Sequence, residues 1–161
     1  MPRSPQPVRV RPMEIDDFRF IQRLASKQFQ FTRPPRYVLW LLKRTNSRSC
    51  MVAEDATHGL AGYLLSLPVN TSREKSLYVW QLAASPRGRR NDAIHLLLLA
   101  LRKLVRRTRV RSVVFTAVSD SPEYRAIRRY AKALSGGAPR CARSLPSSVS
   151  KNEDEFVIRV R

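Results

Sequence analysis

The feature that most constrains the fold is an almost wholly apolar segment, residues 77–84, that runs through a basic turn into a long apolar helix. A strand with so few polar residues is predicted to be covered on both faces. The helix, residues 93–107, is apolar around most of its circumference until Arg106 and must pack in the core. The turn carries three arginines, and the helix start that follows presents free backbone N–H groups and a positive dipole end, which suit a phosphate.

The remaining elements follow from their periodicity, their caps and their breakers. Strands are predicted at residues 8–11, 49–55, 60–68, 113–118 and 155–160, and helices at about 16–28, 35–46 and 121–135. The strands at 49–55 and 60–68 are separated by a short turn and are expected to pair antiparallel. The polar segment that contains Pro139 and Pro146 is expected to be a loop. This order predicts an α+β domain, a mixed sheet flanked by about four helices.

Charge is the most unusual property of the composition, because 31 lysines and arginines face only 12 acidic residues, for a net charge of +19. Such a field attracts nucleic acids, anionic membrane surfaces and acidic substrates. The basic residues are scattered through every predicted element, so arginines on solvated faces without a partner explain the pattern equally well. Both interpretations stay open.

Length and local composition limit the organisation and the setting of the chain. Its 161 residues suit one domain, predicted at 8–161 after a flexible N-terminus at 1–7. No apolar run is long enough to span a bilayer, and the prolines near the start do not suit a secretion signal, so we expect a cytoplasmic protein with no membrane partner. Two separated cysteines and two isolated histidines lack the spacing of metal ligands, so no metal is expected.

Three local patterns add a family resemblance: Tyr-Val-Leu-Trp-Leu-Leu at 37–42, Val-Trp-Gln-Leu-Ala at 79–83 with Pro86, and Asn-Glu-Asp-Glu-Phe-Val-Ile-Arg at 152–159. With these patterns in this order, the chain resembles the acetyl-CoA-dependent N-acetyltransferases of the GNAT superfamily. Within that superfamily it is most similar to the diaminobutyrate acetyltransferases of ectoine synthesis. The resemblance implies a GNAT-like, mainly antiparallel central sheet and acetyl-CoA as co-substrate.

The resemblance also implies a place for acetyl-CoA. In that superfamily the fourth strand parts from its neighbour, its backbone holds the pantetheine arm, and the next turn holds the pyrophosphate. The cofactor-binding residues implied here are Leu82, Ala83, Ala84, Arg87, Arg89, Arg90, Asn91 and Ala93.

The turn departs from the superfamily motif, Arg/Gln-x-x-Gly-x-Gly/Ala, which falls on residues 89–94 and keeps only its leading arginine. Asp92 and Ile94 replace the two small residues, and a carboxylate close to a pyrophosphate repels it. The three arginines offset this if they clamp the phosphates bidentately. In the alternative, Asn91 or Asp92 only caps the helix and no nucleotide binds.

Few side chains suit the chemistry of acetyl transfer. By resemblance, Glu153 and Glu155 hold the ammonium group of the acceptor, although an acidic run most often faces water. Tyr124 is the preferred general acid and Tyr130 the second choice, which packing alone also explains. The substrate pocket is expected to include Trp80, Gln81 and Tyr37, and Arg36 or Arg73 is expected to hold a carboxylate of the acceptor.

Two functions follow from these patterns. In the first, the chain is an N-acetyltransferase that acts on a primary amine of a small, amino-acid-like metabolite, with a homodimer left open. In the second, it is a catalytically lapsed member of the fold that binds nucleic acid or another polyanion through its charge.

Overall fold

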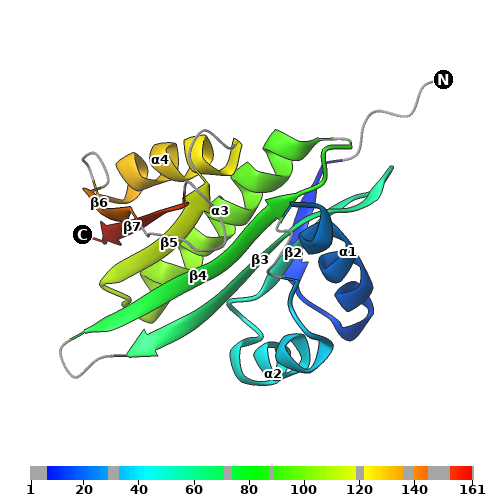
Figure 1. Ribbon diagram of the computed structural model, residues 1–161, viewed down its shortest axis with the longest axis horizontal. Helices are drawn as coiled ribbons and strands as arrows, with labels where there is room; N and C mark the ends of the chain where they lie inside the picture. Colours follow the sequence, from blue (N-terminus) through cyan, green and yellow to red (C-terminus); the bar gives the residue numbers. More distant parts are fainter. Residues whose placement is uncertain are drawn as a thin grey trace.

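The computed structural model describes residues 7–28, 33–70, 74–87, 89–118, 122–135, 140–144 and 153–160. The strands are β1 (Arg9–Pro12), β2 (Met51–Asp55), β3 (Gly59–Asn70), β4 (Lys75–Ala84), β5 (Ser112–Val118), β6 (Arg140–Ser144) and β7 (Glu153–Arg159). The described strands form one seven-stranded sheet in the order β1-β2-β3-β4-β5-β7-β6 (Figure 1). Neighbouring strands are antiparallel except β4 and β5, which are parallel.

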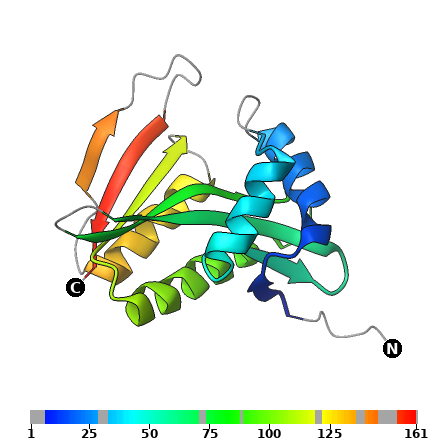
Figure 2. The same cartoon turned by 90° about the horizontal axis from the view of Figure 1, so that it is seen from below.

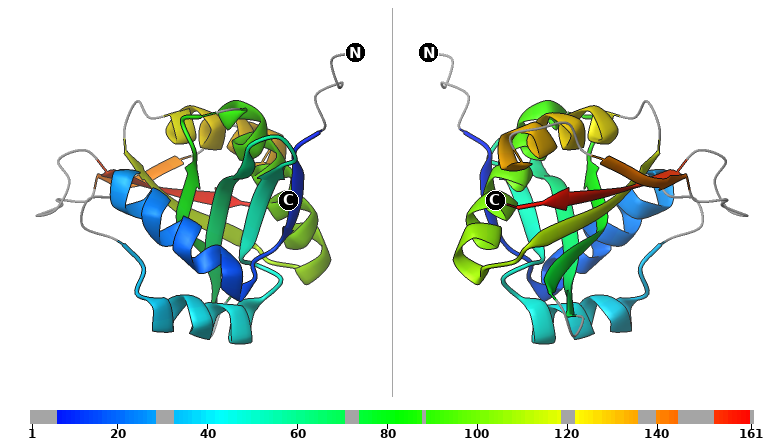
Figure 3. Two further views of the ribbon diagram at one scale, coloured as in Figure 1. Left: turned by 90° about the vertical axis from the view of Figure 1, so that its right-hand side faces the viewer. Right: turned by 90° about the vertical axis from the view of Figure 1, so that its left-hand side faces the viewer.

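The described helices cover both faces of this sheet. They are the 3₁₀ turn η1 (Ile15–Asp17), α1 (Phe18–Gln28), α2 (Arg36–Asn46), α3 (Arg90–Thr108) and α4 (Pro122–Ser135). Helices α3 and α4 lie on one face, and α1 and α2 lie on the other (Figures 1 and 3). The predicted α+β fold with a mixed, mainly antiparallel sheet is confirmed.

The core is divided by the sheet into two apolar clusters. Beneath α3 and α4, buried residues of both helices meet β4 and β5. Beneath α1 and α2, a second cluster joins these helices to β2 and β3. Strand β4 contributes to both, with Val79 and Leu82 in the first cluster and Ala83 in the second. The prediction that this apolar strand is covered on both faces is therefore confirmed.

Arg11 fixes the entry into α1. Its guanidinium donates to both carboxylate oxygens of Asp17 at 2.8 and 2.9 Å and to Glu54 at 2.9 Å. Asp17 is also part of a capping box with Glu14. Strand β1, the turn η1 and strand β2 are joined by this one charged network, and it orients α1 over the sheet.

One element contradicts the prediction. The polar segment expected to be a loop contains β6, which pairs antiparallel with β7. Its sequence, Arg-Cys-Ala-Arg-Ser, lacks the apolar alternation of a half-buried strand, and β6 lies at the edge of the sheet. Pairing with β7 supplies the order that its own residues do not signal.

Candidate functional site

The main opening in the sheet lies where β4 and β5 part. Their parallel pairs run from Ser76 with Ser112 to Val79 with Phe115. Beyond this point, β4 continues to Ala84 in register with β3, and β5 continues to Val118 in register with β7. Figure 2 shows β5, β7 and β6 fanning away from β3 and β4. The two halves of the sheet therefore form a V that opens toward the carboxyl ends of both parallel strands.

Trp80 explains why the strands part at this point. Leu65 pairs with Gln81 and Ser66 pairs with Val79, so Trp80 is an extra residue in β4, a bulge opposite β3. A bulge bends its strand and increases the local twist. Here it comes directly after the last parallel pair, so β4 bends at the residue where its ladder with β5 stops.

The three strand residues expected to contact the pantetheine arm lie on the bent part of β4. Leu82, Ala83 and Ala84 are all buried and are paired with β3. Opposite them, a Cβ on Gly62 would lie 2.8 Å from the carbonyl oxygen of Ala83. The strands β3 and β4 thus approach each other closely beside the opening, and only glycine fits at this position without a shift of the backbone.

The basic turn leads into α3 as predicted, but its arginines have carboxylate partners. Arg89 is the N-cap residue, and its Nε donates to Asp92 Oδ2 at 2.5 Å. Arg90 donates to Glu123 Oε1 on α4 at 2.8 Å, and Glu123 is buried. Arg87 is exposed. The prediction that Asn91 or Asp92 caps the helix is wrong, because both lie inside its first turn.

A cavity of about 460 Å³ lies between the N-terminal half of α3 and α4. Its polar lining includes Asn91, Asp92, His95, Arg102, Arg129 and Tyr130. The hydroxyl of Tyr130 is buried and has no hydrogen-bond partner among the described residues, and the same holds for Arg102 Nε. Burial raises the pKa of the Tyr130 phenol, so the hydroxyl keeps its proton at neutral pH. Two buried donors that have no partner among the described residues therefore line one cavity.

The two tyrosines of α4 differ in their surroundings. Tyr130 is 6% exposed, and its ring makes an edge-to-face contact with Phe115, the last β5 residue of the parallel ladder, at 5.9 Å between centroids. Tyr124 is half-buried, with the guanidinium of Arg128 5.8 Å from its ring centroid. Tyr130 is thus the tyrosine that packs on the residue where the sheet opens.

Sequence comparison decides the family. Residues 13–135 match the model of the acetyltransferase (GNAT) family. The chain belongs to the GNAT family. No curated protein matches the sequence of this GNAT chain significantly.

Solved structures agree with the GNAT fold. The diaminobutyrate acetyltransferase EctA from Paenibacillus lautus, in complex with L-2,4-diaminobutyric acid and coenzyme A, superposes with a TM-score of 0.73 at 21% identity over 98% of this chain and 96% of that one. Ard1 from Thermoplasma volcanium superposes with a TM-score of 0.72 at 21% identity, over 97% of this chain and 99% of Ard1. A chain of the NatC complex bound to Gag peptide and CoA superposes with a TM-score of 0.73 at 13% identity, over 97% of this chain and 100% of the NatC chain. At these identities, the likeness concerns the fold.

The acceptor residues expected in this GNAT chain are spread over several elements. Trp80 is half-buried and packs against the cluster beneath α1 and α2. Gln81 is buried, and its Oε1 accepts a hydrogen bond from the Tyr63 hydroxyl at 2.9 Å. Tyr37 lies at the start of α2 and is 72% exposed. Arg36 is exposed beside it, and Arg73 lies outside the described residues.

Glu153 and Glu155, the acidic pair, lie on β7. This strand pairs with β5 on the side of β5 that faces away from β4 and the opening. Glu155 pairs with Thr116 and Glu153 pairs with Val118, both on the segment of β5 that continues beyond Phe115. The side chains of the two glutamates lie outside the described part of the GNAT chain. Their backbone positions flank the opening from the β7 side.

Sequence reasoning missed two residues that shape this GNAT site. In the sequence, Glu123 is only an acid near the start of a predicted helix, and its partner Arg90 is 33 residues earlier in the chain. Gly62 lies inside a strand, where an isolated glycine is a signal for a close backbone approach. The spacing of nearby residues predicts neither the ion pair of Glu123 with Arg90 nor the contact partner of Gly62 on β4.

The described residues contain no group of three or more histidine, cysteine, aspartate or glutamate side chains that could hold a metal ion. Among the described helices of the GNAT chain, none combines the length and the apolar character needed to cross a bilayer.

Proposed function

We propose that this GNAT-family chain transfers the acetyl group of acetyl-CoA to a primary amine of a small, amino-acid-like metabolite. The observation that carries the proposal is the parting of β4 and β5 at Val79 and Phe115, where the bulge at Trp80 bends β4 away. Beyond this point the facing edges of β4 and β5 border the opening instead of each other. An extended, amide-bearing arm such as pantetheine suits the space between two strand edges.

In this proposal, backbone groups of Leu82, Ala83 and Ala84 bind the arm of the co-substrate. The first turn of α3, which includes Asn91, offers its free N–H groups to the pyrophosphate, whereas the N–H of Ala93 already donates to the carbonyl oxygen of Arg89 at 3.0 Å. The side chains of Arg87, Arg89 and Arg90 add positive charge beside them. Arg87 is exposed and can turn to a phosphate directly, whereas Arg89 and Arg90 must first leave Asp92 and Glu123.

The transfer itself requires a neutral amine nitrogen to attack the thioester carbonyl carbon. The C–N bond forms, the C–S bond breaks, and the amine loses a proton while the departing thiolate gains one. Tyr130 suits the second role better than Tyr124, because its protonated hydroxyl is buried without a partner among the described residues and its ring packs on Phe115. Glu153 and Glu155 are proposed to hold the incoming ammonium group.

The acceptor is proposed to carry a carboxylate as well as an amine. The EctA structure that this chain resembles holds L-2,4-diaminobutyric acid, an acceptor of that kind. A chain with a net charge of +19 repels polyamines and basic peptides during their approach, whereas a carboxylate on the acceptor lowers this repulsion. The exposed Arg36 at the start of α2, with Tyr37, Trp80 and Gln81, is proposed to contribute to this side of the site.

A second function is favoured by the ion pairs of the basic turn. Two of its three arginines already have carboxylate partners, and Asp92 stands where the family motif has glycine. A lapsed enzyme that keeps the fold and binds polyanions through its remaining arginines would show this arrangement. It would bind heparin with a strong salt dependence but would not bind acetyl-CoA.

The test combines binding and turnover. Isothermal titration of the full chain with acetyl-CoA at about 150 mM salt is expected to give saturable binding with one site. Release of free thiol is then followed across a panel of amines, and diaminobutyrate-like amino acids are expected to exceed polyamines in kcat/KM. Absence of acetyl-CoA binding contradicts the acetyltransferase proposal, and binding with no turnover on any amine contradicts the proposed acceptor class.

A further inference from the structure

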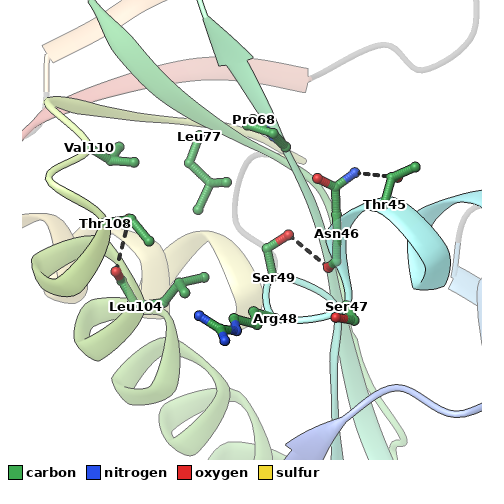
Figure 4. Close-up of a pocket in the computed structure, with 10 residues that line it drawn as sticks. All are labelled: Thr45, Asn46, Ser47, Arg48, Ser49, Pro68, Leu77, Leu104, Thr108 and Val110. Atoms are coloured by element: carbon green, nitrogen blue, oxygen red, sulfur yellow. Dashed lines mark hydrogen bonds between the residues drawn. The ribbon is translucent and has the colours of Figure 1, made fainter.

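A groove runs along α3 from Leu96 to Thr108, between this helix, the edge strand β1 and the end of α2. It consists of two adjoining cavities of about 820 and 360 Å³, which share Arg48, Leu104 and Thr108 in their linings. Figure 4 shows the smaller cavity, with Arg48 reaching from the end of α2 toward Leu104 on α3. We refer to the two cavities together as the basic groove.

The charge of the groove has one sign. Arg48, Lys103 and Arg107 line it and are exposed, and none of the described residues that line either cavity is acidic. The side chains of these three residues form no ion pair or hydrogen bond with another described residue. In contrast, Arg11 and Lys43 on neighbouring elements have carboxylate partners at 2.9 Å or less. The groove therefore keeps three cations uncompensated.

The segments of the chain that surround the groove also have many more basic than acidic residues. Between Phe18 and Ala53 the chain has eight basic and no acidic residues, and between Ala93 and Ser119 it has six basic and none acidic. These two segments supply α2 and α3, the helices that frame the groove. An anionic partner is attracted to the groove by the surrounding surface as well as by its lining.

The floor of the groove is apolar. It includes Val10 and Met51 from the sheet and Leu96, Leu99, Ala100 and Leu104 from α3. The four α3 residues and Val10 are only partly buried, although most of the surrounding core residues are fully buried. Apolar side chains from a partner would gain free energy by covering this floor.

We propose that the basic groove binds an acidic amphipathic segment of a partner protein, with its apolar side chains on the floor and its carboxylates at Arg48, Lys103 and Arg107. The apolar floor favours a peptide over a nucleic acid, which offers phosphates and bases but no aliphatic side chains. Bases bind without sequence preference by stacking on aromatic rings, and no aromatic residue is found among the described residues that line the two cavities.

This groove is separate from the opening between β4 and β5. Asn91, in the first turn of α3, and Arg107, in its last turn, are about 24 Å apart along the helix axis at 1.5 Å per residue. The groove faces β1 at one edge of the sheet, whereas the opening lies beyond the parallel ladder of β4 and β5. Occupation of the groove therefore leaves the acetyl-transfer site accessible.

The proposal is tested with the full chain and a fluorescently labelled amphipathic peptide of glutamate and leucine, by anisotropy at about 150 mM salt. The groove variant is Arg48→Glu, Lys103→Glu, Arg107→Glu. Its matched control, Arg19→Glu, Arg23→Glu, Lys27→Glu on α1, reverses three exposed cations of the same total charge outside the groove. A third variant, Ala100→Gln, fills the floor without a change in charge. Circular dichroism and melting confirm that each variant is folded.

The groove variant is expected to weaken peptide binding at least about tenfold, and the control less than about threefold. Ala100→Gln is expected to weaken binding of the glutamate and leucine peptide but not the weak binding of a glutamate and serine peptide of equal charge. Equal losses in the groove variant and the control would overturn the proposal, since the binding would then follow net charge alone. An oligothymidine that binds more tightly than the peptide and depends on the same three residues would assign the groove to nucleic acid instead.

Discussion

Asp92 accepts a hydrogen bond from Arg89 within the first turn of α3, at 2.5 Å between Oδ2 and Nε. This pair neutralises one arginine of the basic turn at the helix end where phosphate is expected to bind. The Asp92→Asn variant keeps the shape of the side chain and removes its charge, so Arg89 becomes available. Acetyl-CoA is expected to bind about 1 kcal/mol more tightly, roughly fivefold in Kd, because both side chains are about half exposed and solvent screens the effect.

Calorimetry at low and at high salt measures this change, and the gain should shrink as salt increases. The control is Asp16→Asn in η1, an exposed aspartate outside the basic turn. Equal Kd values for the wild type and Asp92→Asn would show that acetyl-CoA does not approach this turn.

The close contact at Gly62 predicts a joint effect on stability and binding. In the Gly62→Ala variant, the new methyl group would lie 2.8 Å from the carbonyl oxygen of Ala83 and 3.3 Å from Ala84, so β3 and β4 must move apart beside the opening. We expect the free energy of unfolding to fall by about 1–3 kcal/mol and the affinity for acetyl-CoA to fall with it. Urea denaturation and calorimetry measure both. Gly59→Asn, at a turn position with φ of 77° and open space, is expected to leave acetyl-CoA binding unchanged.

The hydroxyl of Tyr130 distinguishes catalysis from packing. Because it is buried without a partner in the described structure, Tyr130→Phe should leave stability unchanged or raise it by about 1 kcal/mol. If the hydroxyl protonates the departing thiolate, kcat should fall about 100-fold while the Kd of acetyl-CoA stays constant. Tyr124→Phe is the matched variant on the same helix and should keep most of the activity. Full kcat in Tyr130→Phe would assign this tyrosine to the core alone.

Asp55 predicts a pH dependence of stability. The backbone N–H of Thr57 donates to its carboxylate at 2.8 Å, and His58 lies 3.2 Å from the other oxygen. The hydrogen bond from Thr57, with a smaller contribution from His58, lowers the pKa of Asp55. A carboxyl group with a lowered folded-state pKa adds stability above its unfolded pKa, about 4, and this contribution disappears as the pH falls through the folded value.

The Asp55→Asn variant should therefore melt at a lower temperature than the wild type at pH 7, and the difference should shrink toward pH 3. Thermal melts followed by circular dichroism measure it. His58→Ala should reproduce only a small part of the difference at pH 7, because the main contribution comes from the Thr57 backbone. A constant difference across this range would mean that the charge of Asp55 contributes nothing.

Most of the fold could be predicted because its signals are local. The apolar run at 77–84, the apolar circumference of α3 and the sequence Ser-Pro-Glu at 121–123, which favours a helix start, each specify an element within a few residues. β6 could not be predicted, since its order comes from pairing with β7 across the sheet. The parting of β4 and β5 was expected only from the family resemblance, and its cause, the bulge at Trp80, depends on the register with β3.

The candidate site was harder to predict than the fold. The sequence places Arg89 and Arg90 at the start of the family motif, but it does not predict their ion pairs. The pair of Arg90 with Glu123 depends on how α3 packs against α4, and the pair of Arg89 with Asp92 depends on the geometry of one helical turn. The preference for Tyr124 over Tyr130 followed from expected accessibility in the first turn of the helix. Burial of Tyr130 against Phe115 is the reason that we propose Tyr130 instead, and only tertiary packing creates this contact.

The place of β7 between β5 and β6 has a consequence for aggregation. Seven register pairs tie β7 to β5, so β5 is an interior strand only while β7 is in place. A variant that lacks residues 153–160 would turn β5, with the apolar sequence Val-Val-Phe at its centre, into a sheet edge with open backbone donors and acceptors. Such an edge recruits strands from other molecules, so loss of the last strand would convert a folded domain into a template for self-association.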